Sequence, residues 1–143
     1  MRILLAYDGF DRSSRALEEC AELAAGTEAS VTVLSVVPPD ARGSKSGGHV
    51  GLRPHAHEDV ARAHAFLRER GIDSVMRIAH GDPAEKILEA ALVEPYDLII
   101  MGSRRFGPLK RALLGSVSRE VIRGAPCGVL VVAPELRVPV AAS

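Results

Sequence analysis

Short aliphatic runs alternate with amphipathic segments along most of the chain, and this alternation limits the fold more than any other feature. Aliphatic runs that end at Asp, Gly or Pro are typical of strands buried on both faces. A sheet of such strands is parallel and needs helices packed against each face. Five strands are predicted, at residues 3–7, 31–37, 74–79, 96–101 and 128–133.

Between these strands, apolar residues recur with the 3.6-residue period of an amphipathic helix. Asp82 and Pro83 suit the cap and the first position of one helix, and Gly71 is a candidate C-cap of another. Four helices are predicted, at residues 11–25, 60–67, 82–91 and 116–123. The strict alternation of strand and helix predicts a single-domain α/β fold: a doubly wound, five-stranded parallel sheet with helices on both faces.

The length of 143 residues fits one compact domain. We expect this domain at residues 1–134, interrupted by a flexible Gly- and Ser-rich loop at 40–53. A loose C-terminal tail is expected at 135–143.

Basic and acidic residues balance, with 18 of each and a formal net charge of zero. This balance argues against nucleic acid or an anionic membrane as partner, and 3% aromatic residues without Trp argue against base stacking. Cys20 and Cys127 are too few for a disulfide framework or a four-ligand zinc site, and both are predicted core residues. No apolar stretch resembles a signal peptide or a membrane span, so we expect a soluble, cytoplasmic protein.

In a doubly wound sheet, ligands bind beyond the carboxyl ends of the strands, where the strand order reverses. The segment at 102–118 joins a predicted strand to a helix there and carries Gly102, Gly107 and Gly115. Ser116 then stands at a helix N-terminus, where free amides favour an anion such as a phosphate. The alternative is a glycine-rich connection with Ser116 as an ordinary N-cap, and these features alone do not decide between the two.

Charge along the chain is uneven although the total is zero. Six basic residues against one acid, Glu120, make residues 102–123 +5, so the rest of the chain is −5. The zero total therefore argues against nucleic acid polymers but not against a phosphate ligand. The six basic residues are Arg104, Arg105, Lys110, Arg111, Arg119 and Arg123.

Three stretches resemble the universal stress protein family, and the resemblance covers residues 3–133. They are Leu-Leu-Ala-Tyr-Asp-Gly at 4–9 with Ser13 and Ser14, Asp-Leu-Ile-Ile-Met-Gly-Ser at 97–103, and Gly-Ser-Val-Ser at 115–118 with Ala-Pro-Cys-Gly-Val-Leu-Val-Val at 125–132. The resemblance implies a Rossmann-like fold similar to that of the adenine nucleotide alpha hydrolases. We expect the strand order 3-2-1-4-5, which places strands one and four side by side.

ATP-binding members of that family carry Gly, two residues, Gly, nine residues, then Gly and Ser or Thr. In this chain Gly102 is the first glycine and Gly115-Ser116 the closing pair, but Arg105 stands in place of the second glycine. One reading is that Gly107 supplies the flexibility and Arg105 folds onto the phosphates. The other is that the pocket is crowded and nucleotide binding is weak or lost.

The resemblance also implies roles for individual residues in binding ATP, with or without Mg²⁺. Ala6 and Tyr7 would contribute backbone around the adenine, Asp8 would contact ribose or adenine, and Val36 would pack against the base. The alternative for Asp8 is a turn residue or a cap of the first helix. The residues implied around ribose and phosphates are Met101, Gly102, Arg104, Arg105, Gly107, Gly115, Ser116, Val117 and Ser118.

The expected function is that of a nucleotide-dependent stress-response regulator. Fast phosphoryl transfer needs a metal-binding carboxylate near the phosphates, and the segment has no acid before Glu120, so we expect slow ATP hydrolysis at most. The alternative is a dimeric interaction protein that binds no nucleotide. Under either hypothesis the resemblance implies a homodimer through the last strand, from Gly128 to Ala133.

Histidines offer one further candidate site. His55, His57 and His64 could hold a metal, but no Cys or paired acid joins them, so solvent-facing helix residues are predicted. His80 ends the third predicted strand, and the sequence leaves its role at the pocket rim open.

Overall fold

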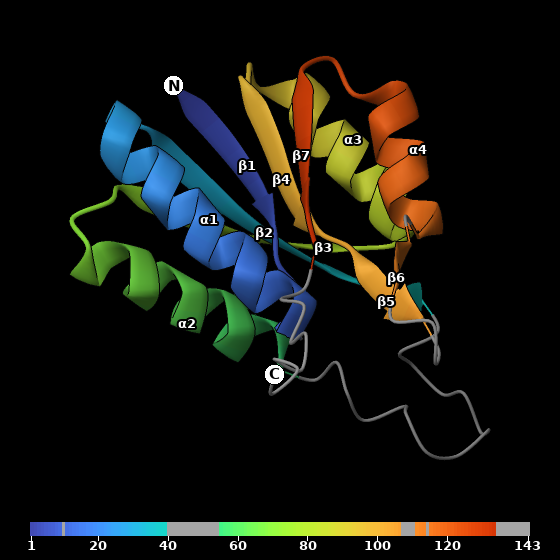
Figure 1. Cartoon of the computed structure of the whole chain (residues 1–143), viewed down its shortest axis with the longest axis horizontal. Coiled ribbons are helices and arrows are strands. Elements are labelled where there is room, and N and C mark those ends of the chain that lie inside the picture. Colours follow the sequence, from blue (N-terminus) through green and yellow to red (C-terminus); the bar gives the residue numbers. More distant parts are fainter. Residues whose placement is uncertain (10, 40–54, 107–110, 114, 134–143) are drawn as a thin grey trace, which may run out of the picture.

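The computed structural model describes residues 1–9, 11–39, 55–106, 111–113 and 115–133 (Figure 1). The predicted loop at 40–53, the predicted tail at 135–143 and Gly107 lie outside the described residues. The helices are α1 (Asp11–Thr27), α2 (Ala56–Glu69), α3 (Pro83–Val93) and α4 (Ser116–Gly124). The strands are β1 (Arg2–Ala6), β2 (Ser30–Val37), β3 (Ser74–His80), β4 (Leu98–Gly102), β5 (Arg104–Phe106), β6 (Arg111–Leu113) and β7 (Gly128–Val132).

Five parallel strands form the main sheet in the order β3-β2-β1-β4-β7. Because β7 is its fifth strand along the chain, the predicted order 3-2-1-4-5 is confirmed. The register places Leu5 opposite Val33 of β2 and opposite Ile100 of β4. Helices α1 and α2 cover one face of this sheet and α3 and α4 the other, as Figure 1 shows.

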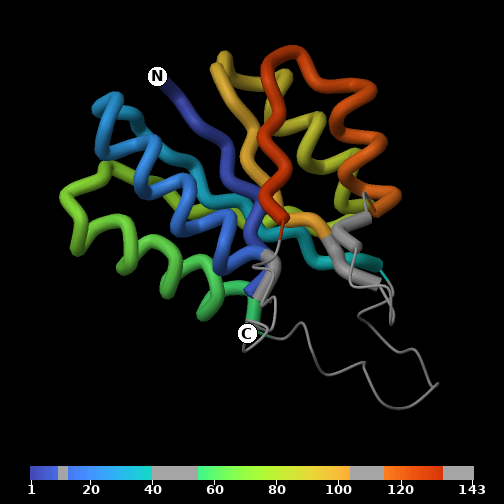
Figure 2. The backbone as a smooth tube through the Cα atoms, viewed as in Figure 1, coloured from blue at the N-terminus to red at the C-terminus, as the bar shows by residue number. Residues whose placement is uncertain are grey.

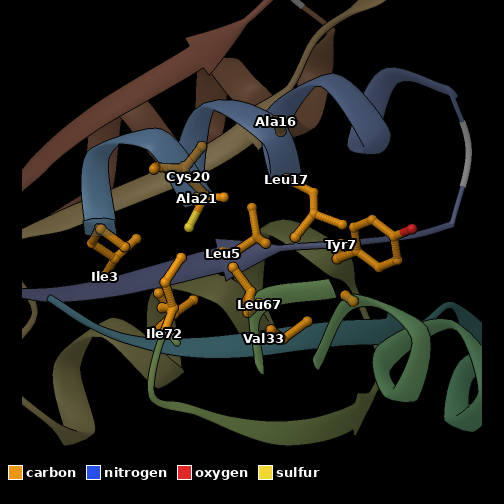
Figure 3. Close-up of a cluster of buried hydrophobic side chains, with 14 of the residues drawn as sticks. Ile3, Leu5, Tyr7, Ala16, Leu17, Cys20, Ala21, Val33, Leu67 and Ile72 are labelled. Atoms are coloured by element: carbon orange, nitrogen blue, oxygen red, sulfur yellow. The ribbon is translucent and has the colours of Figure 1, made fainter. Parts of the chain in front are cut away.

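Successive residues of β1 point to opposite faces, so the strand supplies two separate cores. Ile3 and Leu5 are fully buried in the core under α1 and α2, where Leu67 of α2 packs with them (Figure 3). Leu4 is fully buried in the core under α3 and α4, together with Ile99 of β4. A strand with an apolar residue on each face must lie inside the sheet, which places β1 at its centre.

Helix termini follow the predicted chemistry in two places. Asp82 caps α3, and its Oδ2 accepts a hydrogen bond from the amide of Glu85 at 3.0 Å, with Pro83 in the first turn. Gly71 follows the last turn of α2 with a φ of +71°, and its amide donates to the carbonyl of Arg68 at 2.9 Å.

The prediction of a loop at 102–115 is wrong for the residues of β5 and β6. Within it, β5 and β6 pair as antiparallel strands apart from the main sheet, with Arg105 opposite Ala112. Each strand has three residues, which is too short for an alternating pattern to appear in the sequence. The glycines of this segment and Pro108 are typical of a loop, and they led to that prediction.

Among the described residues, no helix has both the length and the apolarity needed to cross a membrane.

Candidate functional site

The candidate site lies where β1 and β4 end side by side. From β1 the strand order runs outward through β2 to β3 in one direction and through β4 to β7 in the other, so it reverses between β1 and β4. Figure 2 shows that α4 begins at the same end of the sheet as these carboxyl ends. This is the position at which doubly wound folds bind ligands.

Ala6 and Tyr7, which leave β1 one after the other, face opposite layers. Ala6 is half-buried and packs against the core under α3 and α4. The Tyr7 ring is buried under α1 and α2, with its hydroxyl directed away from the neighbouring core side chains (Figure 3). Burial raises the pKa of Tyr7. At this end of the sheet, Tyr7 therefore contributes backbone and not its ring. Its amide donates to the carbonyl of Leu34 at 2.8 Å.

Asp8 is half-buried and held by the first turn of α1. Its amide donates to Oγ of Ser13 at 3.1 Å, and the Ser13 hydroxyl donates to Oδ1 of Asp8. Ser13 is itself buried. Asp8 precedes α1, which begins at Asp11, so it is a turn residue fixed by a serine of the following helix.

Gly9 follows in the left-handed region, with a φ of +80°. A Cβ built on Gly9 would lie 2.7 Å from Cγ and Oδ1 of Asp59, a buried residue in the first turn of α2. The sequence prediction missed Asp59. Its signal was present, because Asp59 falls at helical spacing with the buried Ala56 and Ala63.

The carboxyl end of β4 contributes a buried hydroxyl. Met101 is buried under α3 and α4, and Gly102 is half-buried at the end of the strand. Ser103 is 4% exposed, and its amide donates to the carbonyl of Val132 at 2.9 Å. Its Oγ has no hydrogen-bond partner in the described part of the chain. Ser103 belongs to the stretch that carries the family resemblance, but it was not predicted as a site residue.

Gly115 caps α4 without a side-chain hydrogen bond, so the interpretation of Ser116 as N-cap is wrong. Ser116 is the first helical residue and is exposed, Val117 is half-buried against the core under α3 and α4, and Ser118 is buried. A Cβ at Gly115 would meet no atom of the described residues within 4 Å. The start of α4 therefore has backbone amides that could bind an anion.

Arg104 and Arg105 lie in β5, where Arg105 has ordinary strand backbone. Among the described non-glycine residues only Glu28 has a positive φ, so the position of Arg105 does not require the conformational freedom of glycine. An arginine at the second glycine position could be excluded by a positive φ or by a close approach of the backbone to phosphate. The structure removes the first of these two objections.

Side chains from three elements share the α3/α4 side of this end of the sheet. Ala6 of β1, Val36 of β2 and Val117 of α4 are all half-buried against the same core. Each of the three therefore lies at the margin of the core under α3 and α4. Tyr7 does not join them, because its ring packs in the opposite layer.

Histidines and cysteines build no second site in the described residues. No group of three or more His, Cys, Asp or Glu suited to a metal occurs there. His55 and His57 are exposed, as predicted. His80, for which no prediction was made, is exposed too. His64 is half-buried, and its Nδ1 lies 2.6 Å from Oγ of Ser74. A solvent-facing His64 was therefore the wrong prediction, because α2 packs closely against the start of β3.

Burial raises the pKa of both thiols. Cys20 is completely buried, which raises its pKa to about 12, and the half-buried Cys127 has a raised pKa for the same reason, with Asp97 adding to it. The prediction of a core residue is confirmed for Cys20, and Cys127 lies at the margin of the α3/α4 core.

Comparison with known proteins identifies the family. The model of the universal stress protein family matches residues 1–133. The chain belongs to the universal stress protein family. A universal stress protein of Thermus aquaticus is 36% identical over 132 residues, which cover 91% of this chain and 96% of that protein. The stress response protein NhaX of Bacillus subtilis is 31% identical over 160 residues, which cover 92% and 96% of the two chains.

Solved structures agree with the fold of this universal stress protein. The universal stress protein from Archaeoglobus fulgidus in complex with dAMP has a TM-score of 0.66 and 25% identity, over 92% of this chain and 96% of that chain. The predicted family and the predicted fold are therefore confirmed.

Proposed function

We propose that this universal stress protein binds an adenine nucleotide at the carboxyl ends of β1 and β4. We propose ATP as its ligand and nucleotide-dependent regulation of a cytoplasmic stress response as its role. The observation that carries the proposal is the Oγ of Ser103, a buried hydroxyl without a hydrogen-bond partner in the described residues. Such a group costs about 1–3 kcal/mol, and a ligand with polar atoms would remove that cost.

The adenosine end of the ligand fits the surface between β1 and β2. Ala6 and Val36 are half-buried apolar side chains on the same face of the sheet, suited to a flat base. The carboxylate of Asp8 would accept a hydrogen bond from a ribose hydroxyl, and its hydrogen bonds with Ser13 support this role by holding it in one position. The complex of the Archaeoglobus fulgidus protein with dAMP supports an adenine nucleotide as the ligand class.

The phosphate end fits the start of α4. At the N-cap, Gly115 makes no side-chain hydrogen bond and its Cβ position meets no atom of the described residues within 4 Å, and Ser116 adds an exposed hydroxyl. The segment at 102–123 carries a charge of +5, from six basic residues and one acid. This excess favours a triphosphate over a monophosphate.

Catalysis is not part of the proposal beyond slow hydrolysis. The first turn of α4 holds no acidic residue to bind a metal beside the phosphates. Mg²⁺ would therefore arrive bound to ATP and be held by its phosphates. Regulation through binding and release needs no faster chemistry.

Isothermal titration calorimetry of the nucleotide-free protein with ATP and Mg²⁺, and with dAMP, tests the proposal. We expect binding of both nucleotides, and about fivefold to tenfold weaker binding by Ser103→Ala because one hydrogen bond is lost. The same variant should not lower the melting temperature, since the hydroxyl has no hydrogen-bond partner among the described residues. No heat with either nucleotide at millimolar concentration would overturn the proposal.

Thr32→Val is the matched control for Ser103→Ala. Thr32 also carries a buried hydroxyl, but that hydroxyl accepts a hydrogen bond from Tyr96 at 3.0 Å. We expect Thr32→Val to lower the melting temperature and to leave nucleotide affinity unchanged. The two variants thus separate a hydroxyl kept for the fold from one kept for a ligand.

Arg105→Gly and Gly115→Val test the phosphate end. Weaker ATP binding by Arg105→Gly would show that Arg105 holds phosphate, and stronger binding would show that it crowds the pocket. Gly115→Val should abolish binding while circular dichroism shows a folded protein, because its side chain would occupy the space proposed for the phosphates and would meet no atom of the described residues near Cβ.

A homodimeric interaction module is the second candidate function. Strand β7 forms one edge of the sheet, and Val129, Leu130 and Val131 are only half-buried there. An apolar edge strand can pair with a second copy. Light scattering should then give the mass of a dimer, and Val129→Lys should shift it to that of a monomer.

A further inference from the structure

Asp59 is a buried carboxylate that the proposed nucleotide contacts do not use. It is 6% exposed and lies in the first turn of α2. The residues three before it and four after it on α2, Ala56 and Ala63, are buried too, and Ala63 belongs to the core. Burying a charged group is costly unless other interactions offset the cost, so a carboxylate on this face calls for a specific role.

The contact that singles out Asp59 is with the backbone of Gly9. A Cβ at Gly9 would lie 2.7 Å from Cγ and Oδ1 of Asp59 and 2.8 Å from Oδ2. These distances are too short for any side chain, so the carboxylate fills the room that a side chain of residue 9 would take. Gly9 is the residue that turns the chain after Asp8, with a φ of +80°. The carboxylate thus packs directly on the turn.

The charged and titratable groups that interact with Asp59 include one at the carboxyl end of β1. Nη2 of Arg62 lies 4.0 Å from Oδ1 of Asp59, from an exposed position one turn along α2. Asp59 and Asp8 both act to raise the pKa of Tyr7, and Arg62 acts to lower it. Asp59 therefore belongs to the same charged neighbourhood as Asp8.

We propose that Asp59 is a positioning residue of the nucleotide site, which holds the turn at Asp8 and Gly9 from the α2 side. Ser13 holds the same turn from the α1 side through its two hydrogen bonds with Asp8. Without the carboxylate, Gly9 has free space beside a flexible backbone, and Asp8 loses the fixed position from which it meets the ribose. This inference rests on the proposed function, because Asp8 matters only if a nucleotide binds there.

The test compares Asp59→Ala, which removes the packing, with Asp59→Asn, which keeps its shape. The first readout is amide hydrogen exchange in the nucleotide-free protein at Tyr7 and Asp8, whose amides donate to Leu34 and Ser13. We expect about tenfold faster exchange for Asp59→Ala. We expect about tenfold weaker dAMP binding for the same variant and values within about twofold of wild type for Asp59→Asn.

Val60→Ala is the control, because it creates a cavity in the core one residue further along α2. It should lower the melting temperature without a selective change in exchange at Tyr7 and Asp8 or in dAMP affinity. Unchanged exchange in Asp59→Ala, or equal damage by Asp59→Asn, would overturn the inference. Failure of wild type to bind any nucleotide would overturn the proposed function instead, while the exchange comparison would still decide whether Asp59 holds the turn.

Discussion

The amide of Asp8 donates a hydrogen bond to Oγ of Ser13 at 3.1 Å, and the Ser13 hydroxyl donates in return to Oδ1 of Asp8. A single buried hydroxyl thus fixes both the backbone and the carboxylate of the residue that follows β1. The rotamer of Asp8 is set before any ligand arrives, so no side-chain freedom has to be lost there on binding.

Ser13→Ala should therefore weaken both stability and nucleotide binding. It removes the acceptor of the Asp8 amide and a donor to the Asp8 carboxylate, and these two hydrogen bonds together are worth about 1–3 kcal/mol of unfolding free energy. We expect about fivefold weaker dAMP binding in addition, because Asp8 gains rotamers. Thermal denaturation and calorimetry measure the two effects. Glu22→Ala, at an exposed position of α1, should change neither, and an unaltered Ser13→Ala protein would disprove the role of the hydroxyl.

Gly9→Ala and Gly26→Ala should change stability in opposite directions. Alanine at position 9 must adopt a φ of +80° and place its Cβ 2.7 Å from the Asp59 carboxylate, which costs about 2 kcal/mol or more. Gly26 lies in α1, and a Cβ added there would meet no atom of the described residues within 4 Å, so alanine should stabilise the helix by about 0.5–1 kcal/mol. Urea denaturation of both variants is the measurement. A stable Gly9→Ala protein would show that the turn tolerates an ordinary side chain.

Tyr96→Phe should destabilise the core under α3 and α4 by about 1 kcal/mol. The Tyr96 hydroxyl is buried and lies 3.0 Å from Oγ1 of Thr32 and 3.3 Å from Oε2 of Glu94. The double variant with Thr32→Val should cost less than the sum of the two single variants, because both remove the same hydrogen bond. A double-mutant cycle in urea measures this coupling. Strict additivity would mean that the two hydroxyls do not interact.

The fold could be predicted because its signals are local and repeated. The aliphatic run around Leu5 and the helix capped by Asp82 can each be recognised in the sequence without knowledge of the other. Their alternation leaves few topologies for the sheet. The three-residue strands β5 and β6 were not predicted, because they are held by pairing between their backbones and have no recognisable pattern of side chains.

The candidate site could be predicted only as far as its residues resemble a family motif. Gly115 and Asp8 were found in that way, and the structure places both at the predicted end of the sheet. Ser103 and Asp59 were missed because what marks them arises only in three dimensions. The hydroxyl of Ser103 is buried and has no hydrogen-bond partner in the part of the chain that the structure describes, and the carboxylate of Asp59 packs on a turn that lies far from it in the sequence. His64 was misjudged for the same reason, since Ser74 reaches it only after α2 packs on β3.

Glu94→Gln should make stability less dependent on acid pH. Glu94 accepts hydrogen bonds from the guanidinium groups of Arg77 and Arg2, and these lower its pKa below the usual value of 4.5, with Arg77 the larger cause. Because the folded-state pKa lies below the unfolded one, the carboxylate stabilises the fold above about pH 4.5, and this contribution is lost as the pH falls through the folded-state pKa. The wild-type protein should therefore melt at a higher temperature than Glu94→Gln at pH 7, and the two melting temperatures should converge as the pH falls through the folded-state pKa.

High salt should narrow the difference at pH 7, since the ion pairs are partly exposed. A difference in melting temperature that does not shrink at all as the pH is lowered from 7 into the acid range would mean that Glu94 acts through its shape and not through its charge.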